Sequence, residues 1–172
     1  DVACSSAAIT TLDSTGNVGQ YTSITIGSDG LPIISYYDVD NGDLKAAHCN
    51  DAACTSAALA TVDSVGFVGG YTSITVGADG LPIISYYNGT NLDLKAAHCS
   101  NVACSSAALA TLDSAGIVGQ NTSITIGTDG LPVISYYDNT NGDLKAVHCS
   151  NVACTNAALA TVQRFLLILG SN

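Results

Sequence analysis

Cysteine and histidine are the side chains with the most distinctive chemistry in this sequence, and they recur at a fixed spacing. The pattern His-Cys-x4-Cys begins at His48, His98 and His148. Both residue types ligate zinc, but each copy lacks the paired Cys-x2-Cys spacing of a zinc knuckle. Because the connection between the two cysteines is short enough for a disulfide between neighbouring strands, the pattern predicts three local disulfides. The expected pairs are Cys49 with Cys54, Cys99 with Cys104, and Cys149 with Cys154.

Cys4 is the seventh cysteine and has no partner on this schedule, because the matching position would lie five residues before it. An odd cysteine in an oxidising compartment indicates a link to another chain or a reactive thiol. Since cytosolic thiols are kept reduced, the predicted disulfides indicate an extracellular or cell-surface protein. Asp1 would suit a mature N-terminus left by the removal of a secretory signal.

The histidines also invite a catalytic interpretation, since serine and aspartate lie near each of them, as in nucleophilic triads. Catalysis normally needs one converged constellation, whereas these histidines recur in every copy and glutamate is absent. We therefore expect each histidine to pack beside its disulfide, and we expect no catalytic residue, no enzymatic activity and no cofactor.

Asp38, Asp40 and Asp43 supply several oxygen ligands over a short stretch, as a calcium loop does. The carboxylates become fewer in the two later copies, which favours a polar hairpin turn over a metal site. Asn88 and Asn121 each begin a match to the N-glycosylation pattern, and Asn88 lies in a turn that we expect to be exposed.

Paired tyrosines could stack on sugars, one pair in each copy, and therefore raise multivalent carbohydrate binding as the alternative function. We expect one tyrosine of each pair to fill the space between neighbouring units instead. The pairs are Tyr36 and Tyr37, Tyr86 and Tyr87, and Tyr136 and Tyr137.

These residues are positioned by a repeat of 50 residues, which indicates one supersecondary unit stacked on copies of itself. Alternation in 21–27 predicts a first strand, and Asp29-Gly30 a tight turn. We expect further strands at 31–37, 43–49 and about 54–63. The predicted fold is all-β, with four antiparallel strands in each unit. The expected units are 21–70, 71–120 and 121–162, between an initial segment at 1–20 and a tail at 163–172.

The run SITIGSDGLPIISYYDVDNGDLKAAHC resembles the repeats of secreted bacterial β-propellers. That resemblance covers nearly the whole chain except the tail. It implies propeller-like blades packed through Ile24, Ile26, Ile33, Ile34, Tyr37 and their equivalents. It does not identify an activity, because propellers carry enzymes, lectins and scaffolds alike.

The ends of the chain do not match a closed ring, which usually has four to eight blades. Residues 2–13 predict a surplus outer strand, and the repeat stops after Val162. Val162 is followed by an apolar run, which would be an aggregation hazard if it were exposed. It consists of Phe165, Leu166, Leu167, Ile168 and Leu169. These features predict self-association through the terminal strands, either as a closed six-bladed ring of two chains or, by strand addition, as a filament. A cut from a longer repeat protein is the alternative explanation.

Charge and hydropathy limit the partners. The formal net charge is −10, with only four lysines and arginines and no basic patch, which argues against nucleic-acid binding. The apolar run in the tail is far shorter than the roughly 20 residues that span a bilayer. The sequence therefore predicts a non-catalytic, extracellular structural repeat whose main partner is itself, with glycans as the alternative partner.

Overall fold

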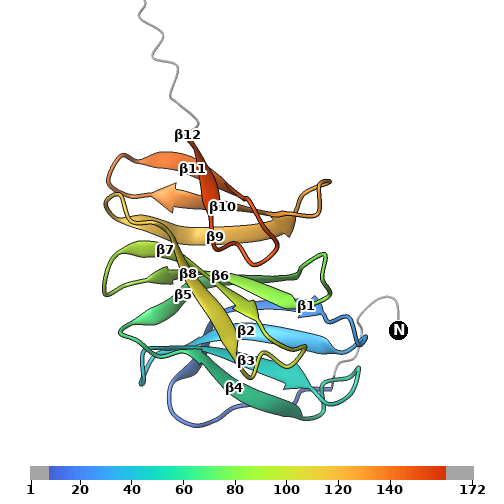
Figure 1. Ribbon diagram of the computed structural model, residues 1–172. Helices are drawn as coiled ribbons and strands as arrows, with labels where there is room; N and C mark the ends of the chain where they lie inside the picture. The colour runs from blue at the N-terminus through green and yellow to red at the C-terminus, as the bar shows by residue number, and fades with distance from the viewer. Residues whose placement is uncertain (1–7, 162–172) are drawn as a thin grey trace, which may run out of the picture.

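Residues 8–161 fold into twelve antiparallel strands arranged as three four-stranded sheets, one for each repeat (Figure 1). The computed structural model describes residues 8–161. The first sheet contains β1 (Val18–Ile26), β2 (Pro32–Asp38), β3 (Asp43–Cys49) and β4 (Ala57–Asp63). The second contains β5 (Val68–Val76), β6 (Pro82–Asn88), β7 (Asp93–Cys99) and β8 (Ala107–Asp113). The third contains β9 (Val118–Ile126), β10 (Pro132–Asp138), β11 (Asp143–Cys149) and β12 (Ala157–Thr161).

The expected strands are present, and the differences lie at their ends. β3 has the predicted bounds, whereas β1 begins three residues earlier than expected. β4 begins at Ala57 instead of Cys54 because Cys54 has a φ of 54°, in the left-handed region, and cannot continue a strand.

The surplus outer strand expected at 2–13 is not found where the structure describes it. Residues 8–17 contain no strand, and each sheet has exactly its own four. The remainder of that expected strand lies outside the described residues. No helix that could cross a membrane occurs within 8–161.

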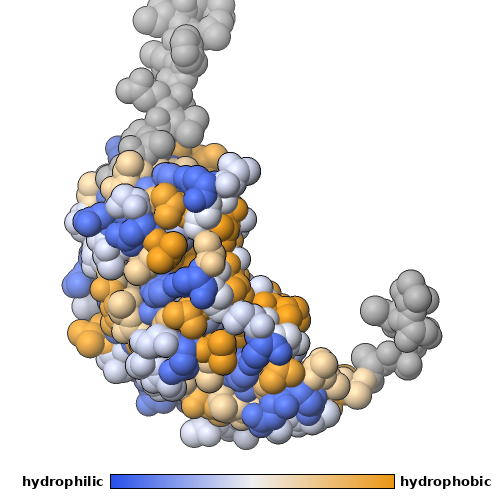
Figure 2. Space-filling model, turned by 45° about the vertical axis from the view of Figure 1, so that its right-hand side comes forward, coloured by the Kyte–Doolittle hydropathy of each residue, from blue (hydrophilic) through white to orange (hydrophobic). Residues whose placement is uncertain are grey.

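The sheets stack face to face in chain order, and the core lies between them. The first junction buries Ile33, Leu44 and Ala46 of the first sheet against Val68 and Ile74 of the second. The second junction repeats this packing one period later, with Ile83, Leu94 and Ala96 against Val118 and Ile124. Figure 2 shows that the stack is curved into a crescent with one hollowed side. The buried apolar clusters therefore lie at the two junctions between neighbouring sheets.

Sequence-equivalent residues differ in burial because of this arrangement. Ile24 is 61% exposed, although Ile74 and Ile124 are 6% and 7% exposed. The prediction that Ile24 and Ile26 are buried between units is therefore wrong for the first repeat, since no preceding sheet covers them within the described residues.

Candidate functional site

Two junctions between neighbouring sheets occur inside the chain. One end of the stack exposes the residues that form one side of such a junction, and the other end exposes the residues that form the opposite side. At the first junction Leu44 packs against Gly69, where an added Cβ atom would lie 2.8 Å from the leucine Cα atom. At the second, Leu94 packs in the same way against Gly119. Both leucines have no exposed surface, whereas Leu144 of the third sheet is 63% exposed. Leu144 is therefore the equivalent of Leu44 and Leu94 in the third sheet, but no glycine among the described residues packs against it.

Gly19 is the complementary half, on the first sheet. An added Cβ atom there would meet nothing within 4 Å, unlike at the two equivalent glycines. Gly19 instead lines a cavity of about 290 Å³, together with Leu12, Val18, Thr22 and Ile34. We call this surface of the first sheet the front face. The opposite surface of the third sheet, with Val133, Ser135 and Leu144, is the back face.

Each junction also contains one buried hydrogen bond between hydroxyl groups. The Thr72 hydroxyl donates to Ser35 at 3.0 Å, and the equivalent oxygen atoms of Ser85 and Thr122 lie 2.7 Å apart. Thr22 on the front face is exposed, and Ser135 on the back face is partly exposed. The two residues that would form this hydroxyl contact therefore lie at opposite ends of the stack, Thr22 on the front face and Ser135 on the back face.

A buried aspartate, tyrosine and lysine join each sheet to the preceding segment of chain. Asp63 ends β4, and its carboxylate accepts hydrogen bonds from the Tyr86 hydroxyl at 2.7 Å and from Lys95 Nζ at 2.6 Å. The lysine Nζ also lies 5.5 Å from the centroid of the Tyr86 ring, within cation–π range. The same cluster forms with Asp13, Tyr36 and Lys45, and with Asp113, Tyr136 and Lys145. Sequence reasoning missed this cluster, although its constant spacing of 23 and 32 residues was available as a signal.

The cluster also changes the protonation chemistry of its members. Burial alone would raise the pKa of Asp13, but hydrogen bonds from Lys45, Thr15 and Tyr36 lower it to about 2. The pKa values of Asp63 and Asp113 are lowered for the same reasons. Burial, followed by the bond to the aspartate, raises the pKa of each tyrosine far above its usual value. The carboxylates are held ionised and the phenols neutral.

This cluster removes one tyrosine of each pair from the candidate ligand residues. Tyr36, Tyr86 and Tyr136 are at most 4% exposed and their hydroxyls are bonded within the protein, so they cannot stack on a glycan. One member of each pair is therefore buried, as expected, but the prediction that this member is Tyr37 and its equivalents is wrong, since Tyr37 and Tyr87 are only partly buried and Tyr137 is exposed.

The second member of each pair lies elsewhere, and two of these residues help to line an aromatic pocket of about 240 Å³. The pocket lies between the first and second sheets and gathers five aromatic rings. It is lined by Tyr21, Tyr37, Phe67, Tyr71, Tyr87 and Gln120, with Gly70 and Gly89. Tyr137 is 36% exposed and does not line the pocket. Tyr21, Tyr71 and Phe67 were not among the predicted ligand residues.

Tyr21 and Tyr71 occupy their positions in the pocket with an unfavourable backbone conformation. Each lies at a bulge in the first strand of its sheet, which is an edge strand, with φ values of 55° and 53°. Tyrosine adopts this left-handed conformation rarely, whereas asparagine tolerates it better. The third repeat has Asn121 at the same position, with a φ of 53°. The ring centroids of Tyr21 and Tyr71 are 4.6 Å apart.

The histidines lie beside aspartates of the tight turns. Nε2 of His98 and of His148 is 2.8 Å from Oδ2 of Asp79 and Asp129, and His48 is similarly 2.9 Å from Asp29. These pairs tie the β3-type strands to the turns that precede the β2-type strands. Because the pair recurs in every sheet, it does not single out one reaction centre.

The turn aspartates bond to the backbone and do not converge. Oδ1 of Asp38 accepts a hydrogen bond from the Asn41 amide, and Asp40 Oδ2 accepts one from Asn17 at 2.8 Å. Within residues 8–161, no three histidine, cysteine or acidic side chains lie close enough to hold a metal ion. Asp38 and Asp40 thus each accept a hydrogen bond from a backbone amide in this region.

The two candidate glycosylation sites differ in exposure. Asn88 is only 3% exposed at the end of β6, and its Oδ1 atom accepts hydrogen bonds from the amides of Thr90 and Asn91. The expectation that Asn88 is exposed is therefore wrong, because this amide is needed to close the turn. Asn121 is exposed.

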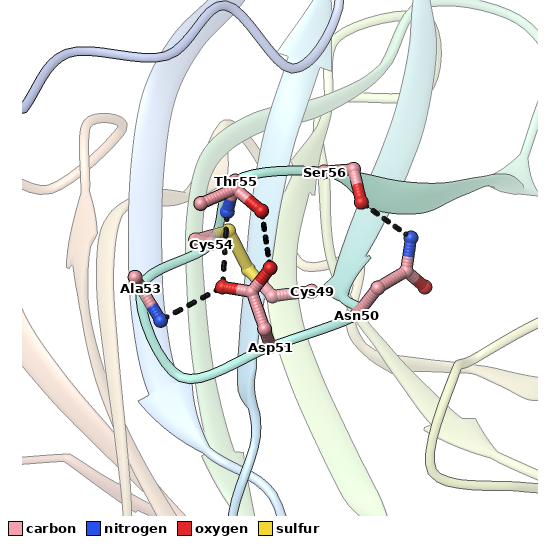
Figure 3. The surroundings of a disulfide bond; sticks show 7 residues. All are labelled: Cys49, Asn50, Asp51, Ala53, Cys54, Thr55 and Ser56. Carbon is pink, nitrogen blue, oxygen red and sulfur yellow. Dashed lines mark hydrogen bonds between the residues drawn. A yellow bond between two sulfur atoms is a disulfide. The ribbon is translucent and has the colours of Figure 1, made fainter.

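The three predicted disulfides are present, and their Cα atoms are 4.8–4.9 Å apart. Figure 3 shows the first of them, Cys49–Cys54, in its loop. The carboxylate of Asp51 accepts hydrogen bonds from the amides of Ala53 and Thr55 and so closes the loop from the opposite side. Cys4 and the apolar run Phe165–Leu169 lie outside the described residues.

Comparison with known proteins supports the fold class and no closer relationship. No family model matches the sequence, and no curated protein matches it. An exo-β-1,3-galactanase from Clostridium thermocellum is similar in structure, with a TM-score of 0.57, 13% identity, and coverage of 90% of this chain and 39% of that one. An α-L-arabinofuranosidase from Lactobacillus brevis has a TM-score of 0.51 and 11% identity over 84% of this chain and 54% of that one.

A fucose lectin from Kordia zhangzhouensis, solved with methyl-fucoside, matches 81% of this chain and 96% of its own length, with a TM-score of 0.48 and 11% identity. The chain spans about half or less of the two glycosidases. At these identities the likeness concerns the fold alone. The protein is thus an all-β protein built of repeated four-stranded antiparallel sheets.

Proposed function

We propose that this protein is a secreted, non-catalytic structural unit that assembles by packing the back face of one copy on the front face of the next. The three disulfides in a small all-β chain support an extracellular location. The sequence resemblance to secreted bacterial β-propeller repeats supports the same location and implies that the sheets act as propeller blades.

One observation carries the proposal: the leucine–glycine contact made at both internal junctions is left open at both ends. Leu144 projects from the back face with 63% of its surface exposed, and Gly19 lines a cavity on the front face. A leucine in the equivalent position fills the equivalent space twice within the chain. A second copy therefore offers a surface equivalent to the one that already packs in this way at the two internal junctions.

The polar groups support the same alignment. Ser135 of one copy would meet Thr22 of the next, as Ser35 meets Thr72 and Ser85 meets Thr122. Because the two faces are different surfaces, the contact is head-to-tail. The crescent shape of three sheets favours closure of two copies into a six-bladed ring over growth into a filament (Figure 2).

The test is the mass of the purified chain by size-exclusion chromatography with light scattering. We expect a particle of twice the chain mass of 17.3 kDa for a ring, or a polydisperse series for a filament. Burying one leucine contributes about 2 kcal/mol, so Leu144→Asp should weaken association by roughly 30-fold or more. Leu109→Asp is the matched control, since Leu109 is 42% exposed on β8 of the central sheet. A monomeric wild-type chain at all concentrations would end the proposal.

Two further variants separate this contact from the ends of the chain. Removal of 163–172 eliminates the apolar run Phe165–Leu169, and Cys4→Ser eliminates the odd thiol. If assembly depends on the faces, both variants should still assemble and Leu144→Asp should not. Assembly that is lost only with the tail, or only in reductant, would instead assign self-association to those segments.

A further inference from the structure

We propose that the aromatic pocket between the first and second sheets binds a neutral saccharide. This inference goes beyond the proposed function, because the pocket lies between two sheets inside the stack and not on either end face. Its residues come from both sheets and from the start of the third, so it is absent from any isolated repeat.

The shape of the pocket suits a small ring. Its volume of about 240 Å³ lies just below the range typical of small-molecule sites, about 300–1,000 Å³, and so suits a ligand no larger than one sugar ring. Tyr21 and Phe67 are 44% and 65% exposed, so a ligand can reach their faces. The Tyr21 and Tyr71 rings are tilted by 43° with their centroids 4.6 Å apart, so the two rings contact each other and form one continuous aromatic surface.

The chemistry of the lining selects the class of ligand. The eight lining residues include no charged side chain, which disfavours ions. Their polar groups include tyrosine hydroxyls and the Gln120 amide, and their apolar surface is aromatic. A ligand that matches must have an apolar face and hydroxyl groups at its edge but no charge, and a pyranose sugar has these properties.

Backbone strain supplies an independent argument that the rings have a role. Tyr21 and Tyr71 occupy a left-handed conformation that costs of the order of 1 kcal/mol or more for a bulky residue. Asn121 shows that the fold accepts a better-suited residue at this position. Tyrosine is therefore not required by the backbone there, and binding at the pocket gives a reason for the ring.

The experiment uses the full chain and an array of neutral and acidic glycans, followed by titration with the methyl glycosides of glucose, galactose, mannose and fucose. Because the chain has no tryptophan, the fluorescence of its eight tyrosines reports binding directly. The test variant is Tyr71→Asn, which places at the strained position the residue that the third repeat already carries there. The matched control is Tyr137→Ala, because Tyr137 is the third-repeat equivalent of Tyr37 and Tyr87 and lies outside the pocket.

We expect at least one neutral glycoside to bind, Tyr71→Asn to weaken that binding by 10-fold or more, and Tyr137→Ala to change it by less than twofold. Glucuronate should bind more weakly than the neutral sugars. The proposal is overturned if no neutral glycan binds, if acidic glycans bind better, or if both variants affect binding equally. None of these results depends on assembly, since the same titration can be made on Leu144→Asp.

Discussion

At the scale of single residues, every lysine of this protein belongs to the same kind of buried cluster. Three of its four lysines and arginines are the lysines of the aspartate–tyrosine–lysine clusters, and each lysine side chain is at most 13% exposed. The paired aspartate side chains are buried as well, with at most 6% of their surface exposed. Each cluster connects a sheet to the segment before it, so these residues align successive repeats.

The low pKa of the cluster aspartates predicts acid sensitivity. The pKa of Asp13 falls from 3.8 in the unfolded reference to about 2 in the fold. Its contribution to stability is therefore complete above about pH 4 and is lost as the pH falls through about 2. We expect the melting temperature to fall steeply over this interval. Asp63→Asn should reduce the fall, and an unchanged pH profile in that variant would assign acid sensitivity to other groups.

Lys95→Met should be strongly destabilising, because it leaves the fully buried Asp63 carboxylate without its charged partner. Breaking a buried pair in this way costs about 3–5 kcal/mol. The double variant Asp63→Asn/Lys95→Met should lose much less than the sum of the two single variants. Chemical denaturation of the four proteins measures this coupling, and additive losses would show that the pair is not coupled.

At the scale of elements, each repeat is completed by its own turns and its own disulfide. The second cysteine of each bond has a left-handed backbone, with φ values of 52–54°, and so ends the connection before the outer strand begins. Hydrogen bonds of Asp51 in the first loop, and of Asn101 and Asn151 in the others, support the same geometry. The outer strand is thereby held against the third strand of its sheet.

Loss of one disulfide should destabilise the protein moderately without unfolding it. The Cys99–Cys104 bond closes a short loop, and the chain-entropy relation gives about 2 kcal/mol for such a loop. We expect Cys99→Ser/Cys104→Gly to lower the unfolding free energy by about this amount, with glycine accepting the φ of 54° at position 104. Cys99→Ser/Cys104→Ser is the comparison and should be less stable. Equal stability of the two variants would show that the left-handed backbone carries no cost.

At the scale of the whole molecule, three stacked sheets make two complete junctions and two half-junctions. The two half-junctions are the back face with the exposed Leu144 and the front face with the cavity beside Gly19. They are different surfaces, so blocking one leaves the other intact. The direction of assembly can therefore be tested by combining variants.

Leu144→Asp blocks the back face, and Thr22→Arg places a large charged side chain in the cavity of the front face. We expect each variant to be monomeric alone, since every head-to-tail contact needs one intact front face and one intact back face, and each variant retains only one of the two. An equimolar mixture should form a dimer through the one pair of intact faces, detected by light scattering. A mixture that stays monomeric, or a dimer formed by either variant alone, contradicts a head-to-tail contact.

The sequence by itself determined the features that lie within one repeat: the period of 50, the four strands, the tight turns and the three disulfides. These follow from residues close together in the chain, such as Asp29-Gly30 in a turn or Cys49 and Cys54 across a short connection. The Asp-Gly turns and the cysteine pairs recur in every copy, so a single copy is enough to predict them.

Only the tertiary structure decided which of these equivalent residues are buried and which are available. Ile24 and Ile74 lie in the same local pattern, yet Ile24 is exposed and Ile74 is buried. The reason is that the first sheet packs against Ile74, whereas no sheet within residues 8–161 packs against Ile24. The aspartate–tyrosine–lysine clusters and the tyrosine pocket also join residues of different sheets. Such contacts arise from stacking, and stacking breaks the equivalence that the repeated sequence implies.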